Sequence, residues 1–205
     1  MEKLEEISKL ASIISDSTLR STVDVILNHE DFFSFPASTH IHHAYVGGLA
    51  AHTIEVSQIA GALCLLHPKA DKDIVIAAAI WHDFAKLWDY KLVTYFKSLD
   101  KEKPFGDLPK RYVMVEEKEA YKKIYQADFD YKDRIHHISG SMAEFTVAAT
   151  IRGVSRSKIQ AVQHAILAHH GRKDWGTVKD PQTIEAWILH TADYSSAHFG
   201  PTRAS

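Results

Sequence analysis

A histidine and an aspartate stand next to each other inside an apolar stretch of this 205-residue sequence. They are His82 and Asp83, within the run Ala-Ala-Ile-Trp-His-Asp-Phe-Ala-Lys of residues 78–86. The apolar run predicts a buried helix over residues 71–87, and a buried carboxylate is costly unless it is paired or binds a metal. Lys86 follows His82 by four residues, so it lies one turn further along roughly the same face. The stretch predicts a reactive site to which the rest of the chain must bring partners.

The composition indicates one globular domain over residues 1–205, with N-terminal helices in 1–39 and a core in 40–200. Lys and Arg total 24 and Asp and Glu total 26, which gives a net charge of −2. Strong binding to long duplex nucleic acid is therefore not expected, because such binding depends on neutralising phosphates. The single cysteine, Cys64, allows neither an intrachain disulfide nor a cysteine-based metal site.

The sequence shows no sign of a membrane partner. Its first residues, Met-Glu-Lys-Leu-Glu-Glu-Ile, are acidic and amphipathic, unlike a signal peptide. Its longest apolar run, residues 74–81, is too short to span a bilayer. We expect a soluble, cytoplasmic protein.

Hydrophobic periodicity predicts an all-α bundle. The expected helices cover residues 4–14, 18–29, about 42–66, 71–87, 138–153, 155–170 and 181–199. Asp16 or Ser17 is the expected N-cap of the second helix, and Pro181 fits the first turn of the last. The pair Gly47-Gly48 falls inside the third helix, where close packing or a ligand would explain it.

Residues 88–134 break the helical pattern and predict a small β-hairpin or irregular insertion. Two short runs, 93–97 and 111–115, have β-like composition. The segment 116–123 is expected to form a helical turn or two.

Histidine is unusually frequent, with fourteen residues, and several lie in apolar surroundings. Candidate metal ligands fall on five different predicted segments: His52, His82 with Asp83, His137, His169 with His170, and Asp193. A helix bundle that points these positions inward would build a site of nitrogen and carboxylate donors. Such donors suit Fe, Mn, Zn, Co or Ni better than Ca or Mg.

Helix geometry sorts several other histidines. His164 and His198 are five residues from His169 and Asp193, so they lie on other faces of their helices. His190 is three residues from Asp193 and could support the site. Ordinary structural or surface roles are expected for His29, His40 and His67.

The order His, His-Asp, His, His-His, Asp resembles the two-metal variant of the HD superfamily of metal-dependent phosphohydrolases. Residues 42–53, His-His-Ala-Tyr-Val-Gly-Gly-Leu-Ala-Ala-His-Thr, and 166–171, Ile-Leu-Ala-His-His-Gly, sharpen this likeness. They are similar to the HD domains of bacterial 3′→5′ exoribonucleases and to those found with conjugation relaxases, as are residues 175–176 and 185–193. The resemblance covers roughly residues 40–200 and implies an HD-type helical bundle.

The resemblance also implies roles for individual residues. His52, His82, Asp83 and Asp193 would hold one metal, and Asp83 would bridge to a second, held also by His137 and one or both of His169 and His170. Lys86 would stabilise negative charge on a phosphate. Candidate substrate contacts are His43 at the site mouth and Arg172 and Lys173 in the following loop. For these three residues, ordinary structural or solvated roles are the alternative.

Three departures from the family pattern matter. Ala85 replaces the usual glycine before the motif lysine. Members with three metals place an acidic residue one turn before the first histidine, where this chain has Gly48, so a third metal is not expected. The exoribonucleases carry an oligonucleotide-binding barrel that is absent here, so this chain alone is not expected to bind long RNA.

The leading hypothesis is a phosphodiesterase or phosphomonoesterase in which two divalent metals activate a hydroxide. Its substrate would be a phosphorylated small molecule, a nucleotide or a short single-stranded nucleic acid end. One alternative is a diiron HD-type oxygenase acting on a small polyol or phosphonate. Another is a non-catalytic HD module that binds a ligand.

Overall fold

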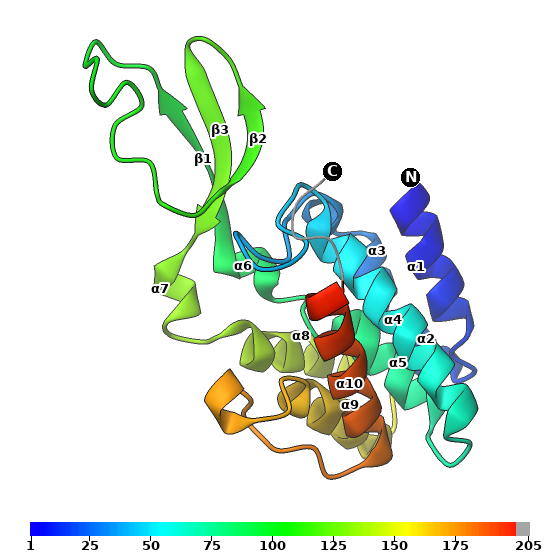
Figure 1. Cartoon of the computed structure of the whole chain (residues 1–205). Helices are drawn as coiled ribbons and strands as arrows, with labels where there is room; N and C mark the ends of the chain where they lie inside the picture. Colours follow the sequence, from blue (N-terminus) through cyan, green and yellow to red (C-terminus); the bar gives the residue numbers. More distant parts are fainter. Residues whose placement is uncertain (200–205) are drawn as a thin grey trace.

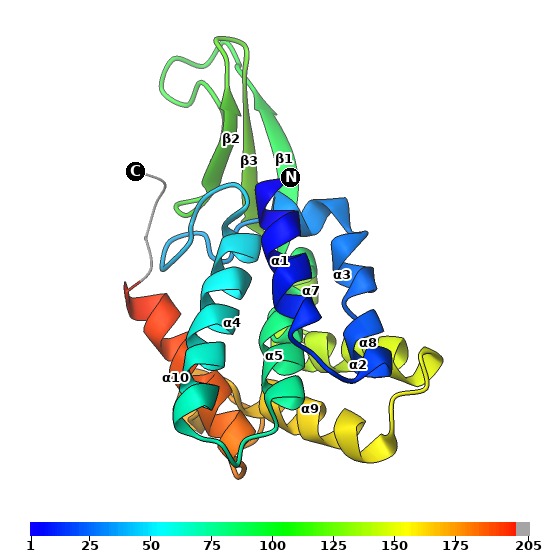
Figure 2. The ribbon, with the colours of Figure 1, turned by 90° about the vertical axis from the view of Figure 1, so that its right-hand side faces the viewer.

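The central element of the helical body is α5 (Lys72–Trp81), whose residues from Ile74 to Trp81 are all buried. The computed structural model describes residues 1–199. In it, α5 packs against six helices that enclose it (Figures 1 and 2). They are α1 (Glu2–Ser12), α2 (Ser17–Ser21), α4 (Gly48–Leu66), α8 (His137–Ile151), α9 (Arg156–Ala168) and α10 (Ile184–Phe199). A helix that is apolar on every side needs such an all-round enclosure.

The N-terminal helices form as predicted, except that the expected helix over 18–29 is two short helices, α2 and α3 (Asp24–Leu27). Thr22 lies at the break, where its hydroxyl donates to the Leu19 carbonyl at 2.7 Å and accepts from the Trp81 indole at 3.1 Å. The hydrogen bond from Trp81 to Thr22 therefore joins this segment to the core helix. A 3₁₀ helix, η1 (Glu30–Phe33), follows between the second and third of the expected helices.

The sequence pattern had placed the glycine pair inside the third helix, but the pair lies at the N-terminus of α4. Gly47 is the N-cap residue with φ +77°, and Gly48 is the first helical residue. A Cβ on Gly48 would overlap the His43 carbonyl oxygen. The close packing expected at these glycines is thus confirmed. It lets the loop of residues 37–47 pack against the first turn of α4.

The prediction of a continuous helix over residues 71–87 is wrong in one respect that matters for the site. The helix ends at Trp81, and tight turns over residues 82–85 lead into the short α6 (Lys86–Asp89). Hydrogen bonds in this stretch run three residues back, as from the Lys86 amide to the Asp83 carbonyl at 2.9 Å. The Ser141 hydroxyl on α8 accepts from the Ala85 amide at 2.9 Å and fixes the turn.

The insertion is a three-stranded antiparallel sheet that projects from the helical body (Figure 1). Its strands are β1 (Tyr90–Phe96), β2 (Val113–Glu117) and β3 (Tyr121–Ala127), in the order β1-β3-β2. The helical turns predicted over 116–123 are wrong, because that segment holds the end of β2, a turn and the start of β3. Glu117 and Lys122 pair across these two strands at 2.7 Å.

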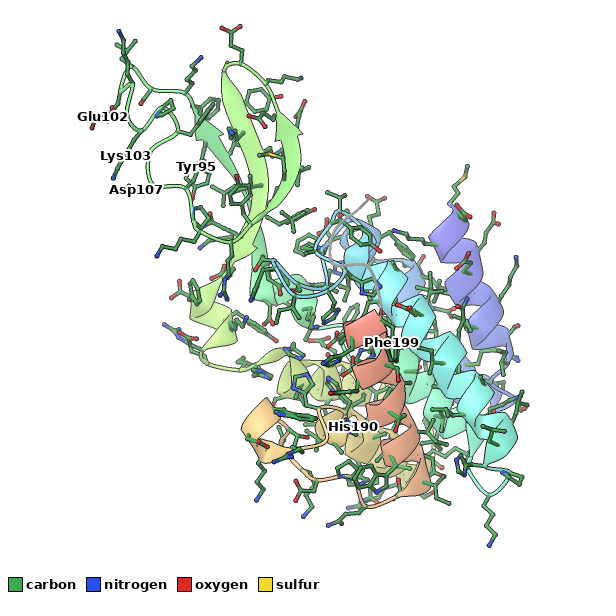
Figure 3. The ribbon with its side chains drawn as sticks, viewed as in Figure 1. Tyr95, Glu102, Lys103, Asp107, His190 and Phe199 are labelled. Atoms are coloured by element: carbon green, nitrogen blue, oxygen red, sulfur yellow. The ribbon has the colours of Figure 1, made fainter. Side chains whose placement is uncertain are left out.

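The base of the sheet is attached to the N-terminal loop. The Tyr125 ring lies 4.6 Å from the Phe35 ring, and its hydroxyl donates to the Ser34 hydroxyl at 3.2 Å. The short α7 (Phe129–Lys132) then leads from β3 back towards α8. We call the segment from Tyr90 to Ala127 the arm; side chains at its tip, such as Lys103, are labelled in Figure 3.

The C-terminal half follows the prediction closely. Helices α8 and α9 replace the expected 138–153 and 155–170 with shifts of one or two residues, and η2 (Lys173–Trp175) interrupts the predicted loop. Pro181 precedes α10 by three residues and does not lie in its first turn, as had been expected. Residue 200, the predicted end of the core, lies outside the described residues.

By length and hydropathy α4 could cross a membrane, but half of its most apolar window is buried in the body.

The Asp16 carboxylate gives a test of how the N-terminal helices are held. It caps α2 by accepting from the Thr18 and Leu19 amides, and it pairs with Lys158 of α9 at 2.7 Å. Substituting Asp16→Ala should lower the free energy of unfolding by about 1–2 kcal/mol, whereas Asp16→Asn, which retains the cap, should cost less. Thermal unfolding at pH 7 measures both, with Asp24→Ala at an exposed helix start as the control.

The effect should depend on pH in a defined direction. The Lys158 pair and the cap hold the pKa of Asp16 below its ordinary value of 3.8. A carboxylate with a depressed pKa stabilises the fold above its unfolded pKa and loses that contribution as pH falls. The deficit of Asp16→Ala should therefore be constant from pH 7 to 5 and shrink below about pH 4. A deficit that grows with acid would contradict the assignment.

Candidate metal centre

Five segments deliver the seven predicted ligands to one place around Asp83. They are His52 from α4, His82 and Asp83 from the turn after α5, His137 from the start of α8, His169 and His170 from the end of α9, and Asp193 from α10. Asp83 is 1% exposed. The structure therefore brings together every residue that the sequence had marked as a candidate ligand.

One group of donors faces one oxygen of Asp83. The His52 and His82 Nε2 atoms lie 3.3 Å apart, and each is 3.4 Å from Asp83 Oδ2. Asp193 Oδ1 lies 3.0 Å from His52 Nε2 and 3.8 Å from His82 Nε2. We call His52, His82 and Asp193 the first group.

A second group faces the other oxygen. His137 Nε2 and His169 Nε2 lie 3.5 Å and 3.7 Å from Asp83 Oδ1. Together with His170, these residues offer nitrogen atoms within 4.8 Å of one another. The two oxygens of Asp83 are thus divided between two histidine groups.

The second nitrogen of each ring is held by the protein. Nδ1 lies 2.7 Å from the Ala79 carbonyl for His82, 2.7 Å from the Ile166 carbonyl for His169 and 2.8 Å from the Trp175 carbonyl for His170. Because a carbonyl only accepts, each Nδ1 carries the proton and each Nε2 of a neutral ring keeps its lone pair. This is the tautomer in which Nε2 can bind a metal.

The other two rings are oriented by side chains. His137 Nδ1 lies 3.2 Å from Asp89 Oδ2, and His52 Nδ1 lies 2.9 Å from the Ser196 hydroxyl. That hydroxyl in turn donates to Glu55 at 2.8 Å. Carboxylate–histidine pairs of this kind orient ligands in metal sites and raise their basicity.

The unmet hydrogen-bonding capacity of the second group fits a metal. Asp83 Oδ1, His137 Nε2 and His169 Nε2 are all buried and have no hydrogen-bond partner within residues 1–199. Buried polar atoms are normally satisfied, and here three unsatisfied ones converge with lone pairs directed at a common space. Imidazole and carboxylate donors are those that divalent transition metals prefer.

The protonation of the second group and of Asp83 agrees with this chemistry. Burial holds the pKa values of His137 and His169 well below the ordinary value, so both rings are neutral. Burial opposes a charge on Asp83, but Lys86 and His82 hold its pKa well below the usual range. Burial also raises the pKa of Asp89 to about 6, which leaves it mostly ionised at pH 7.

Lys86 lies beside the carboxylate that joins the two groups. Its Nζ is 2.6 Å from Asp83 Oδ2, and the residue is 8% exposed. Lys86 also lines a cavity of about 420 Å³ together with His170 and Asp193. This cavity, which we call the mouth, gives a small molecule access to the centre.

Aromatic side chains line the mouth. The rings of Trp175 and Tyr194 stack at 5.5 Å with a 16° interplanar angle, and Tyr194 stacks on His198 at 3.9 Å. Trp175 and Tyr194 are 45% and 43% exposed. The Arg172 guanidinium lies 5.2 Å over the Trp175 ring and pairs with Asp174 at 3.0 Å, while Lys173 is exposed.

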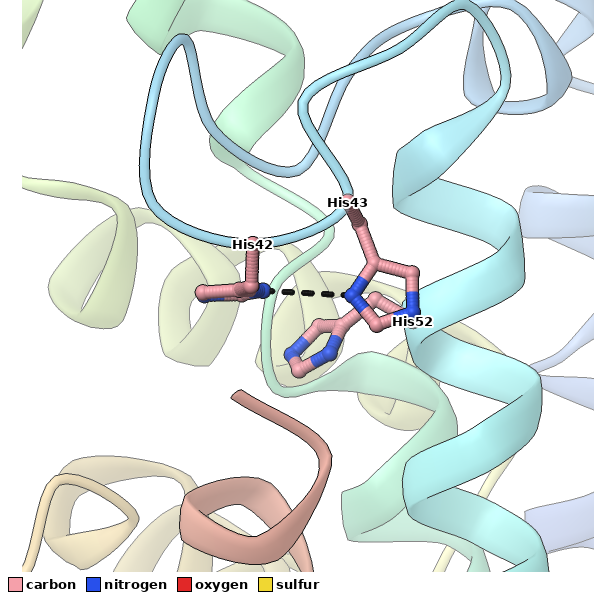
Figure 4. A group of neighbouring side chains, drawn as sticks. All are labelled: His42, His43 and His52. Atoms are coloured by element: carbon pink, nitrogen blue, oxygen red, sulfur yellow. Dashed lines mark hydrogen bonds between the residues drawn. The ribbon is translucent and has the colours of Figure 1, made fainter. Parts of the chain in front are cut away.

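Three histidines meet where the loop of residues 37–47 crosses α4 (Figure 4). His42 Nδ1 lies 3.3 Å from His43 Nδ1, and both rings contact the ring of His52. His43 has φ +46°, is 2% exposed, and pairs through Nε2 with Glu55 at 3.0 Å. His43, the predicted substrate contact, is therefore directed at Glu55, and its neighbour His42 lines the mouth.

His190 and His164 lie as helix geometry predicted, but His198, which was expected on another face of its helix than Asp193, lines the mouth together with it. His190 supports the site, because its Nδ1 donates to the His169 carbonyl at 2.8 Å. A Cβ on Gly171 would overlap the His190 ring, so this contact needs the glycine; His190 is labelled in Figure 3. The His164 ring instead accepts from the Gln182 amide at 3.1 Å.

The sequence reasoning missed the residues that orient the ligands: Asp89, Ser196 and Glu55, as well as His42 at the mouth. A signal existed for two of them. Ser196 follows Asp193 by three residues on α10, and Asp89 follows Lys86 by three. Both spacings place the residue on the same side of a helix as its neighbour in the site.

Removing one orienting residue should weaken one group of donors at a time. Asp89→Ala should lower the affinity of the second group for Mn²⁺ by about 10–100-fold, and Ser196→Ala should do the same for the first group. Titration calorimetry, with metal content measured after dialysis, should show a different one of two binding steps weakened in each variant. Loss of both steps in either variant would contradict two separately oriented groups.

Comparisons with known proteins identify a family and relatives of this chain. The family model described as HD domain matches residues 49–198. The 3′-5′ exoribonuclease YhaM of Geobacillus sp. (strain WCH70) is 26% identical over 94% of this chain and 51% of its own length. Those of Bacillus subtilis (strain 168) and Bacillus pumilus (strain SAFR-032) are each 30% identical, over 85% and 80% of this chain and 46% and 43% of their own lengths.

The chain spans about half the length of these relatives. No solved structure gave a significant match. The family match covers the segment from α4 to α10 that carries the donors around Asp83. The chain therefore belongs to the HD domain family of metal-dependent phosphohydrolases, as the order of its histidines and aspartates predicted.

Proposed function

We propose that this chain hydrolyses a phosphoester of a nucleotide or of a single-stranded nucleic acid end at a centre that holds two divalent metals. The observation that carries the proposal is the division of Asp83. One oxygen faces His52 and His82, and the other faces His137 and His169. A carboxylate shared in this way suits two neighbouring cations.

The proposed ligands are those that the sequence predicted. His52, His82, Asp83 and Asp193 would hold one ion, and Asp83, His137, His169 and His170 the other. Bound there, Mn, Fe, Ni, Co or Zn ions would supply Lewis-acid activation of a water and of the phosphoryl oxygens. The neutral rings of His137 and His169, with the tautomer described above for His169, allow the second group to bind a metal at pH 7 without prior loss of a proton from either ring.

The chain's own residues would bind and orient the substrate. Burial alone would lower the pKa of Lys86, but the Asp83 carboxylate outweighs burial and raises that pKa, so the ammonium stays charged at the edge of the mouth. A fixed positive charge there stabilises negative charge that develops on a phosphoryl group. His42, which lines the same cavity, is better placed than His43 to contact a bound substrate.

Two observations favour a substrate with a nucleobase. The relatives are named as 3′-5′ exoribonucleases, and exposed Trp175 and Tyr194 lie beside Lys86 and Asp193 in one cavity. Aromatic side chains stack on bases with a free energy of about 1–3 kcal/mol per base. Such a substrate agrees with the cytoplasmic location expected from the sequence.

The metal assignment is tested by hydrolysis. Mn²⁺-loaded protein should hydrolyse bis(p-nitrophenyl) phosphate, and His82→Ala and Asp83→Ala should each abolish turnover because each removes donors from the centre. His164→Ala is the matched control, since His164 lies outside the centre, and should retain activity. Retained turnover in both site variants would contradict the proposal, as would O₂ uptake by Fe²⁺-loaded protein with a polyol or phosphonate and no phosphoester cleavage.

The aromatic side chains test the substrate class. Trp175→Ala should lower kcat/KM for a short oligonucleotide about tenfold, within the range expected for the removal of one base stack. The variant keeps the backbone carbonyl that orients His170. Trp187 is another half-exposed tryptophan, and it lines a separate cavity. Trp187→Ala is therefore the control and should leave kcat/KM unchanged. An equal decrease in Trp175→Ala on an oligonucleotide with an abasic end would show that the ring does not act by stacking.

A further inference from the structure

Two cavities outside the metal centre lie at the joint between the arm and the helical body. Their volumes are about 570 Å³ and 490 Å³, within the usual range for ligand sites. Both are lined by Thr39 and His40 from the body and by Lys110 and Arg111 from the arm. The four shared residues line both cavities, and we call this paired space the joint site.

The joint site carries more positive than negative charge. Lys110, Arg111 and Lys132 line it and make no ion pair with any of residues 1–199. Of the acidic residues around it, Glu117 is paired with Lys122 and Asp128 with Lys91, which leaves Asp130 against three cations. A concave surface with excess positive charge attracts anions.

Arg111 is positioned as an anion-binding group. Its Nη1 donates to His40 Nε2 at 2.7 Å, and burial, together with the nearby Arg111 and Lys132 charges, lowers the pKa of His40. His40 is therefore a neutral acceptor that holds the guanidinium without neutralising it. The other N–H groups of the guanidinium remain available for the paired bonds that arginine makes to phosphate.

Aromatic rings accompany these charges. Tyr45 and Tyr112 line the larger cavity, and Phe129, which is 66% exposed, lines the smaller one. Basic groups that follow a backbone, interleaved with rings on which bases stack, are the common design of single-strand binding grooves. A small phosphorylated metabolite would need neither the length of two cavities nor three separated rings.

One short loop connects the joint site to the metal centre. Thr39 and His40 line the joint site, and the next two residues, Ile41 and His42, line the mouth. Figure 1 shows this loop at the base of the sheet, beside α6, which begins with Lys86. A strand lying across residues 39–42 would place one end at the mouth and its body in the joint site.

We propose that the joint site binds the nucleotides that flank the scissile phosphate of a single-stranded nucleic acid. This inference rests on the proposed function for the identity of the reacting end. It assigns to the arm the task of holding the strand, with Arg111 and Lys110 contacting its phosphates. It also gives this chain a strand-binding surface of its own, built in part from the segment that the sequence had marked as a small β-hairpin or irregular insertion.

Binding of an uncut strand tests the inference directly. The probe is a fluorescein-labelled, phosphorothioate-linked oligouridylate of about 12 nucleotides, a length within the footprint of single-strand sites. Fluorescence anisotropy with the full chain should show that Arg111→Ala raises Kd about tenfold. The double variant Lys110→Ala, Arg111→Ala should reduce the slope of log affinity against log salt by about 1.4, or about 0.7 for each phosphate that is no longer neutralised.

Two further variants make the test specific. Lys97→Ala is the matched control, because Lys97 is an exposed, unpaired cation among the described residues, at the far end of β1 beside the turn at Ala120; its Kd should change less than twofold. Arg111→Lys should keep the salt slope while losing part of the affinity. Thermal unfolding of each variant should match that of the unchanged protein.

The outcomes separate this inference from the proposed function. All arm variants should hydrolyse bis(p-nitrophenyl) phosphate normally, since it has no flanking nucleotides. If no phosphoester is cleaved, the proposed function fails while the binding data still decide on the joint site. Unchanged oligonucleotide affinity in Arg111→Ala would overturn the inference. So would displacement of the probe by uridine monophosphate at the same concentration as by the oligonucleotide, because the site would then hold a single phosphate.

Discussion

The structure depends on how one carboxylate, Asp83, is kept charged at the end of the most apolar helix. Burying an ion without partners costs several kcal/mol, and Asp83 is 1% exposed. Its partners come from α6, α4, α8 and α9, so the same interactions that stabilise the charge fix how these elements pack around α5. The packing of the helices around α5 and the convergence of polar groups on Asp83 therefore depend on the same elements.

The sequence predicted most of the helices, because apolar periodicity depends on local spacing, and the order of its histidines and aspartates marked the residues that lie around Asp83. Apolar periodicity marked α1, α4, α8 and α9, and the spacing of His164 from His169 correctly placed it outside the centre. The break after Trp81 could not be seen, since the apolar pattern continues through Phe84 and Leu87 while the backbone tightens to fit Ser141. The apolar pattern of a sequence predicts which side chains are buried, but it does not predict how the backbone between them turns.

The arm shows the other limit. The segment around Glu116–Lys123 is rich in Glu and Lys, which favour helices in isolation, yet β3 pairs with β1 on one side and β2 on the other. Pairing between distant strands overrides such a weak local preference. Among the orienting residues, Glu55 was missed for a related reason, because it acts across the bundle on both His43 and Ser196.

The order in which the chain supplies its donors has a consequence for local stability. The second group draws its histidines from α8 and α9, whereas the first group also needs Asp193 from α10, the last helix in the described residues. Helix α10 packs against α4, α5 and α9, and single elements can open locally at a lower free-energy cost than global unfolding. Opening of α10 would take the carboxylate partner away from His52 and His82 while the histidines of the second group stay on α8 and α9.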